Sequence, residues 1–447
     1  MTASYRIHLI NPPSASGTLA NREGAAGMGV VYPDPKAFCY PPHTLAVVAA
    51  SLRDEGYQVR AFDAVVEEPA SDWEQADAIG VFVSYASLNA DLAFIAQLRS
   101  RTCARLIAFG PAMRFVVDDV LTRAPVDMVL VGEAEAFFGP AFHFLMGQGA
   151  KSSPRQLTPQ DVQASGYDSQ GLLRDLDTLP FPAWDLLPYP KYSLLTVMSS
   201  RGCPDPCTFC PYAAAQGHRF RARSVENVLS ELEYVERRFR PARLIFRDPV
   251  FAHQRQRVIE LCTGMSKRNL SLRWECESRP EHFDRELLRL LQRAGCQWVK
   301  VGLETTDKDM LQRLRRVSTS EEAETYLQHT AEIVHVCNEI GLGCRLFVMA
   351  GLPGQNTDMA ENTRLFVEHA HPTALNVKLC ERYPGTDLPG SLGEDNYEAQ
   401  LQVLGQAQKA LLADDSAPSM LGRGKRWLRR RLHSLAICWA RRGGRDA

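Results

Sequence analysis

Three cysteines in one short stretch rich in Gly and Pro carry the clearest chemical signal of this sequence. Cys203, Cys207 and Cys210 have the spacing C-x3-C-x2-C within residues 201–211. Iron–sulfur clusters are held by cysteine thiolates, normally four of them, so three thiolates would leave one iron open to another ligand. A structural zinc site is the alternative, but it needs four ligands, and His218 is the only further candidate nearby. The spacing therefore favours an iron–sulfur cluster with an open coordination position.

The remaining nine cysteines give no second motif of this kind. They are scattered, mostly within apolar runs, where a free cysteine behaves as a small hydrophobic residue. They are Cys39, Cys103, Cys262, Cys276, Cys296, Cys337, Cys344, Cys380 and Cys438. A disulfide framework is typical of short secreted chains, whereas this chain has 447 residues and starts without an apolar signal segment. No window approaches about 18 consecutive apolar residues, so we expect a cytoplasmic protein without a membrane-spanning helix.

The C-terminal tail differs in charge from the rest of the chain, whose composition is that of an ordinary globular protein. From Arg423 onward there are nine Lys or Arg residues and one Asp, so the tail carries +8 and the rest −9. Residues 424–442 can form one basic helix with an apolar stripe. The stripe consists of Leu428, Leu432, Leu435 and Trp439. We expect the helix to dock on the same protein; peripheral contact with an anionic membrane or an acidic partner is the alternative, and nucleic acid is not expected.

The first 148 residues alternate between strand-like and helical stretches. The strand-like stretches span residues 5–10, 58–63, 78–84, 105–109 and 127–131. A helix is predicted over 42–54, with Thr44 as its N-cap. This alternation predicts a parallel, doubly wound sheet, in which ligands bind beyond the carboxyl ends of the strands. The residues at those ends are Asn11, Pro12, Pro13, Ser84, Tyr85, Gly110, Pro111, Gly132 and Glu133. Taken singly, each glycine or proline there can equally serve only to turn the chain.

A region without periodicity separates this part from a second α/β unit. Residues 149–190 are rich in Gly, Pro and Ser, so we expect a linker, in which Trp184 is interpreted as a packing anchor between domains rather than a substrate contact. Six strand-like stretches then alternate with helices. They span residues 194–199, 242–246, 272–276, 298–301, 344–349 and 374–379. In α/β barrels the chemistry lies on the loops that follow the strands, and the cysteine loop follows the first of these six.

Polar residues lie one or two positions beyond several strands of this second unit. They are Asp248, Glu277, Arg279 and Glu304. Carboxylates suit ammonium groups and diols, and arginine binds a carboxylate through two hydrogen bonds. Surface salt bridges are the alternative for each residue, but the repeated placement behind successive strands favours a binding site.

Both units resemble parts of one known family. The cysteine loop, with Phe209 directly before its last cysteine, resembles the cluster loop of radical S-adenosylmethionine (SAM) enzymes, and the six βα units resemble their partial barrel. The order of residues 5–145, above all the turn Val131–Glu135, resembles the cobalamin-binding domain that precedes many radical SAM domains. No Asp-x-His-x-x-Gly motif follows the first strand, which implies cobalamin bound without a protein histidine below the cobalt. The chain therefore resembles the cobalamin-dependent radical SAM enzymes.

The resemblance implies three cofactors and their sites. A [4Fe-4S] cluster would bind the three cysteines, and the amino and carboxylate groups of SAM would fill its open iron. Glu277 and Glu304 would contact the ribose or methionyl end of SAM and Arg279 its carboxylate, with Phe209, Asp248 and Gly302 in the same neighbourhood. Cobalamin would bind at the strand ends of the first sheet. No further catalytic residue is assigned.

The fold expectation is α/β. It comprises a Rossmann-like, doubly wound cobalamin-binding domain over 1–148, a linker over 149–190, a partial (βα)6 radical SAM barrel over 191–390, and a small helical C-terminal segment with the basic tail over 391–447.

The resemblance also implies the activity. The family transfers a methyl group from SAM, through methylcobalamin, to an unactivated carbon of a small molecule, and it needs an external one-electron reductant of the flavodoxin or ferredoxin type. An enzyme that forms a ring or rearranges carbon without methylation is the second hypothesis, and a redox sensor without turnover is the third. A methylthiotransferase is disfavoured because the first domain holds only Cys39 and Cys103. The substrate is not indicated by the sequence.

Overall fold

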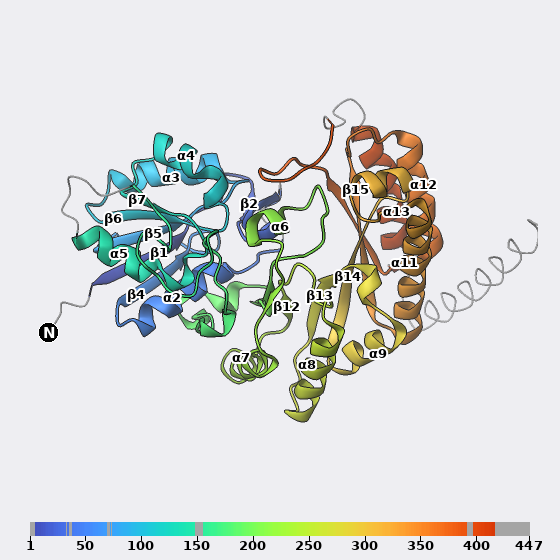
Figure 1. The fold of residues 1–447 in the computed structure, drawn as a ribbon, viewed down its shortest axis with the longest axis horizontal. Coiled ribbons are helices and arrows are strands. Elements are labelled where there is room, and N and C mark those ends of the chain that lie inside the picture. The colour runs from blue at the N-terminus through green and yellow to red at the C-terminus, as the bar shows by residue number, and fades with distance from the viewer. Residues whose placement is uncertain are drawn as a thin grey trace, which may run out of the picture.

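The computed structural model describes residues 5–147 except 33, 35–37, 69–71 and 73, together with residues 155–390 and 397–415. Figure 1 shows two α/β units side by side, the first in blue and cyan and the second in green to orange. Each unit is built on a six-stranded parallel sheet. The predicted α/β class with two successive units is confirmed.

The first sheet has the strand order β4-β1-β5-β6-β7-β8, and all of its pairs are parallel. Its strands are β1 (Arg6–Asn11), β4 (Gln58–Asp63), β5 (Ala78–Phe82), β6 (Arg105–Phe109), β7 (Met128–Leu130) and β8 (Gln156–Leu157). Helices α2 (His43–Asp54) and α5 (Phe138–Gly147) pack on one face, and α3 (Leu88–Arg99) and α4 (Met113–Arg123) on the other. Helices on both faces explain why these strands read as nearly continuous apolar runs. Strand β8 comes from the region predicted to be a linker.

The start of α2 differs from the prediction. The N-cap residue is Pro42, which makes no side-chain cap, so the prediction of Thr44 as N-cap is wrong. The backbone N–H of Thr44 instead donates to Oε1 of Glu23 at 2.7 Å. A carboxylate at a helix N-terminus satisfies free N–H groups and interacts favourably with the helix dipole. Glu23 lies twenty-one positions upstream, so the short-range rule for capping could not find it.

The second sheet has the order β16-β15-β14-β13-β12-β9, again with parallel pairs throughout. Its strands are β9 (Leu195–Val197), β12 (Leu244–Phe246), β13 (Trp274–Ser278), β14 (Cys296–Glu304), β15 (Gly343–Ala350) and β16 (Ala374–Leu379). Strands β9 and β16 do not pair within the described ranges, so the six units form an open sheet, as expected for a partial barrel.

Six α-helices of the described residues lie between these strands along the chain after residue 224, and five of them have a side-chain N-cap. They are α7 (Val225–Arg238), α8 (Arg255–Lys267), α9 (Arg285–Arg293), α10 (Lys308–Arg313), α11 (Ser320–Ile340) and α12 (Thr357–Ala370). Ser224 caps α7, and Asp284, Asp307, Thr319 and Asn356 cap α9 to α12, each through its side-chain oxygen. Helices α9, α11 and α12 lie on the side of the sheet away from the first unit (Figure 1).

Helix α13 (Tyr397–Asp415) follows the second sheet and packs against α12 and β16. The buried Gln400 side chain accepts a hydrogen bond from the backbone N–H of Gly351 at 2.8 Å, which ties this helix to the end of β15. The expected helical segment is therefore present, whereas the basic helix over 424–442 lies outside the described residues. Within the described ranges, no helix combines the length and apolar character needed to cross a membrane.

The segment before β9 fastens the two units to each other. Trp184 is fully buried, and its ring lies 5.8 Å from the His43 ring of α2. Nδ1 of His43 is in turn 3.1 Å from Oγ1 of Thr196 on β9. Tyr192 donates to Asp63, at the end of β4, at 2.8 Å. These contacts fit the interpretation of Trp184 as a packing anchor, because a side chain without exposed surface cannot reach a substrate.

The buried His43 should make stability depend on pH. Burial, followed by the nearby Arg201 and Arg223, lowers the pKa of His43 from 6.5 to about 3. Above pH 6.5 the residue is neutral in both states, whereas below it the unfolded chain gains a proton that the folded chain does not. Stability should therefore fall on acidification, by up to about 1.4 kcal/mol per pH unit, or about 2 kcal/mol between pH 6.5 and 5.

Denaturant unfolding at pH 7, 6 and 5 would measure this effect. The loss of stability in His43→Gln should be smaller than in the wild type by that amount, and the exposed control His335→Gln should follow the wild type. The prediction would be contradicted if the free energy of unfolding fell by the same amount with pH in the wild type and in His43→Gln.

Candidate functional site

The cysteine loop lies at the carboxyl end of β9, between the short strand β10 (Ser200–Arg201) and helix α6 (Pro211–Gln216). Strand β10 pairs with β11 (Arg221–Ala222), which folds the chain back beside the loop. Gly202 has φ +79°, and a Cβ at this position would collide with the carbonyl oxygen of Arg219. Glycine is therefore required directly before the first cysteine.

The three cysteines line one cavity of about 1140 Å³. Burial raises the pKa of Cys203 to about 12, and the nearby Asp205 contributes less to the same shift. Burial also raises the pKa of Cys210 above its ordinary range, with a smaller contribution from Cys207. Among the described residues, no three His, Cys, Asp or Glu side chains surround a position for a single metal ion. A four-iron cluster binds each thiolate through a different iron, so three thiols spread along one wall fit such a cluster.

Five of the six residues predicted to contact SAM line the same cavity. They are Phe209, Glu277, Arg279, Gly302 and Glu304. Neither Glu277 nor Glu304 has a side-chain hydrogen bond to any described residue, and burial raises the pKa of Glu304. Glu304 also has φ +67°, a left-handed conformation that costs a non-glycine residue on the order of 1–3 kcal/mol and is concentrated at functional sites. The cavity thus presents two carboxylates that are free to bind a ligand.

Asp248, the sixth residue, does not line this cavity. It is 2% exposed and accepts hydrogen bonds from the N–H and hydroxyl of Ser199, at 2.8 and 2.6 Å, and from the hydroxyl of Ser200 at 2.5 Å. Asp248 therefore braces the chain that leads into the cysteine loop. A contact between Asp248 and SAM therefore stays a prediction, and this residue is the one of the six that does not line the cavity.

Arg316 belongs to the cavity although the sequence did not suggest it. Its Nη1 lies 3.6 Å from Sγ of Cys207, and Nη1 of Arg279 lies 3.8 Å from the same sulfur. Nη2 of Arg316 donates to the carbonyl of Gly302 and to the hydroxyl of Tyr326, at 2.8 and 2.9 Å. Two guanidinium groups beside one cysteine can stabilise its thiolate. Arg279 was predicted because it lies just beyond a strand. Arg316 follows a short helix instead, so its position in the sequence did not suggest a binding role.

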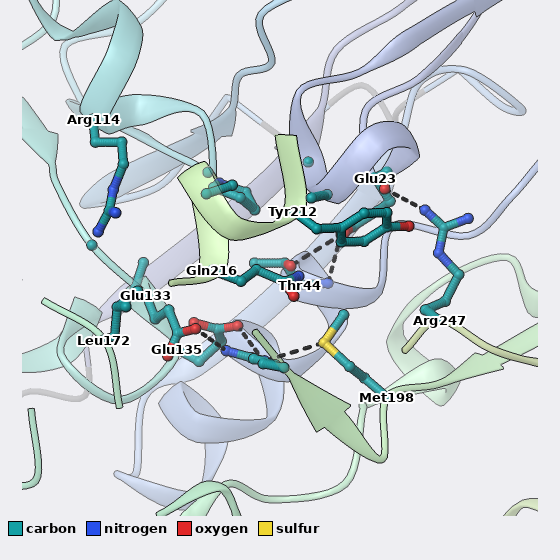
Figure 2. A pocket seen from close by; sticks show the side chains of 18 residues that line it. Glu23, Thr44, Arg114, Glu133, Glu135, Leu172, Met198, Tyr212, Gln216 and Arg247 are labelled. Carbon is teal, nitrogen blue, oxygen red and sulfur yellow. Dashed lines mark hydrogen bonds and ion pairs between the residues drawn. The ribbon is translucent and has the colours of Figure 1, made fainter. Parts of the chain in front are cut away.

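A second cavity, of about 620 Å³, lies between the strand ends of the first sheet and helix α6 (Figure 2). Four of the predicted cobalamin-site residues line it, namely Gly110, Pro111, Gly132 and Glu133. Gly110 has φ +144°, and an added Cβ would meet the carbonyl oxygen of Val83. Bare backbone at these strand ends permits a large ligand to approach closely.

The other predicted residues of this group do not line the second cavity. Asn11 donates to Asp63 at 2.7 Å and accepts from Arg22 at 3.1 Å, while the N–H of Ser84 donates to Asp91 at 3.1 Å. Pro12 is buried and Pro13 is exposed. The ring of Tyr85 lies 6.3 Å from the ring of Tyr383 in the second unit. Asn11 and Ser84 thus belong to a buried network around Arg22 rather than to the cavity.

Four charged residues join the two units at the edge of this cavity, and we call them the ion cluster: Glu133, Glu135, Arg201 and Arg221. Nη2 of Arg201 lies 2.7 Å from Glu135 and its Nη1 3.3 Å from Glu133, while Nη1 of Arg221 lies 2.8 Å from Glu133. Figure 2 shows Glu133 and Glu135 next to each other in this pocket. Burial alone would raise the pKa of Glu133, but the two arginines hold it below its ordinary value. The cluster connects the turn after β7 directly to the residue before Gly202.

Comparison with known proteins extends over both units. Residues 197–367 match the profile of the Radical SAM superfamily. An uncharacterized methyltransferase from Pyrococcus horikoshii is 24% identical, over 78% of this chain and 77% of its own length. The hopanoid C-3 methylase of Methylococcus capsulatus is 28% identical, over 77% of this chain and 67% of its own length. The radical SAM methyltransferase TsrM from Kitasatospora setae, solved with cobalamin and a [4Fe-4S] cluster, has a TM-score of 0.65 at 18% identity and covers 86% of this chain and 77% of TsrM.

Residues 197–367, which include the cysteine loop and most of the second sheet, match the Radical SAM superfamily. Several of the similar proteins are named as methyltransferases, and the two-unit fold is shared with TsrM. The predicted resemblance is confirmed at the level of the family.

Gly202→Ala should disturb the cysteine loop. The substitution forces a side chain into a left-handed conformation and against the Arg219 carbonyl, so the loop has to shift. We expect the variant, prepared anaerobically with iron and sulfide, to hold less than half of the wild-type iron. Gly341→Ala is the matched control, because Gly341 has φ +76° with open space around it, and its iron content should stay unchanged. Full iron content in Gly202→Ala would refute the assigned constraint.

Proposed function

We propose that this protein is a cobalamin-dependent radical SAM methyltransferase that transfers a methyl group from SAM to an unactivated carbon of a small molecule. The observation that carries the proposal is the arrangement of two cavities at one interface. One presents three cysteines with free carboxylates, and the other lies at the strand ends of a doubly wound sheet. When bound, the cluster with SAM supplies a radical that removes a hydrogen atom, and cobalamin supplies the methyl group.

The first cavity has groups that match each part of SAM. The cysteines would hold three irons of the cluster. Glu277 and Glu304 offer acceptors for the ammonium group and the ribose diol, and Arg279 offers a bidentate donor for the carboxylate. Arg316 adds a second guanidinium at the same side, next to Cys207. These residues would bind and orient SAM.

The types of residue that line the second cavity are compatible with cobalamin. Gly110 and Gly132 leave backbone bare, and no histidine is among the described residues that line the cavity. His43, in α2, is buried and is not among the residues that line this cavity. Cobalamin is larger than a drug-sized ligand, so we expect neighbouring side chains to move aside when it binds.

The proposed activity requires a substrate and an electron donor. The substrate is a small molecule, and a flavodoxin- or ferredoxin-type protein would deliver the single electron that the cluster needs. A cytoplasmic location stays a prediction, as does peripheral membrane contact through the basic tail. Ring formation or rearrangement without methylation is the second candidate function, and the product mass separates the two because methylation adds one CH2 group.

The cluster assignment predicts that Cys207→Ala loses its iron and all reductive cleavage of SAM. Iron content and 5′-deoxyadenosine should be measured on anaerobic preparations with dithionite. Cys262→Ala is the control, since Cys262 is a free cysteine that is fully buried in α8, away from the cavity, and the variant should retain both. Wild-type iron in Cys207→Ala, or stoichiometric zinc in the wild type, would sink the assignment.

The cobalamin assignment predicts a corrinoid without a histidine ligand. The wild type should bind hydroxocobalamin, and His43→Gln should bind it with the same affinity and the same visible spectrum. The reason is that His43 makes its contact across the unit boundary, to Thr196, and does not line the cavity. A spectral change in His43→Gln would argue against the assignment, and a wild type that binds no corrinoid would remove its basis.

A further inference from the structure

The two cavities share one side chain. Among the described residues that line them, Tyr212 is the one that belongs to both. It is the second residue of α6, two positions after Cys210, so the cysteine loop fixes its place. Any ligand in the first cavity and any ligand in the second therefore meet opposite sides of this residue.

The first unit supplies the rest of the wall. Helix α1 (Gly24–Gly27) contacts α6, and its successive residues face different sides: Ala25 lines the cysteine cavity, whereas Ala26 and Gly27 line the strand-end cavity. Ala25 (φ 47°, ψ 52°) and Ala26 (φ 60°, ψ 34°) are both left-handed. Such residues cost on the order of 1–2 kcal/mol each and persist where the surrounding packing imposes them. The wall is thus held in place from both units.

The hydroxyl of Tyr212 has no hydrogen-bond partner in the described part of the chain. In Figure 2 the hydroxyl end of the ring is directed toward the side of the pocket that carries Arg247. Tyr212 is half-buried, and its hydroxyl is not among the fully buried side-chain atoms that lack a partner, so this group can be reached from outside the protein. A free hydroxyl between two binding cavities is therefore available to a ligand.

We propose that Tyr212 is a positioning residue that keeps SAM and cobalamin apart and holds the reacting carbon of the substrate between them. The inference rests on the proposed function. In that function one carbon first loses a hydrogen atom on the SAM side and then gains a methyl group on the cobalamin side, so it must be reachable from both cavities. Tyr212 lines both cavities, so it lies at the place that such a carbon has to occupy. The size of its ring limits how much of the substrate fits between the cavities.

Ligand linkage tests this role without knowledge of the substrate. SAM affinity is measured by anaerobic equilibrium dialysis on protein with its cluster, with and without saturating hydroxocobalamin. In the wild type the two dissociation constants should agree within about twofold, because the ring keeps the ligands apart. In Tyr212→Ala they should differ by about fivefold or more, the lower end of measured couplings between sites. Tyr212→Phe should match the wild type, since it keeps the ring.

Two one-sided variants serve as controls. Met349→Ala changes the cysteine cavity alone and Leu172→Ala the strand-end cavity alone. Each can shift the affinity of one ligand, but the effect of cobalamin on SAM binding should stay within about twofold, because the wall is intact.

The outcomes separate this inference from the proposed function. If the wild type binds both ligands and Tyr212→Ala shows the wild-type linkage, the role of Tyr212 is overturned while the proposed function stands. If Tyr212→Ala loses its iron or its cobalamin, the residue builds one site rather than separating two, and the inference is again overturned. If the wild type binds no cobalamin at all, the proposed function fails, and the inference fails with it.

Discussion

The ion cluster of four buried charges determines how the two units of this protein meet. Glu133 and Glu135 lie in the turn after β7 of the first sheet, and Arg201 and Arg221 flank the cysteine loop of the second unit. A buried charge that loses its partner destabilises a protein by on the order of 3–5 kcal/mol, so the units cannot slide without breaking several strong contacts together. The relative placement of the two cavities, and of the wall between them, follows from this constraint.

The cysteine loop adds anchors of its own on three sides. The N–H of Cys203 donates to Gly217, the N–H of Thr208 donates to Leu314, and the N–H of Asp387 donates to the carbonyl of Thr208, all at 3.0 to 3.1 Å. The segment that contains Asp387 also lies against Phe115 of the first unit, through Gly385. Backbone contacts of this kind fix the loop independently of its side chains. A radical reaction needs such fixed geometry, because reacting atoms have to meet within a narrow range of distance.

Local patterns in the sequence were sufficient for the fold and for the cysteine loop. Strand periodicity identified the parallel sheets, and cysteine spacing identified the loop, because both signals lie in neighbouring residues. The errors arose where a distant residue decides the outcome. Asn11 and Ser84 sit at strand ends as expected, but Arg22 and its partner Asp91 draw them into a buried network. Tyr212 gave no signal, because its position between two cavities exists only after the units have packed.

The division of charge within the ion cluster bears on how such proteins can evolve. Both acids are encoded in the first unit and both bases in the second, so neither unit is electrically satisfied at this surface by itself. A gene fusion or recombination event that brought in a first unit from another lineage would succeed only with a barrel that already carried matching arginines. These four codons are therefore expected to be inherited as a set, and a mismatched hybrid would be eliminated at the stage of folding rather than of catalysis.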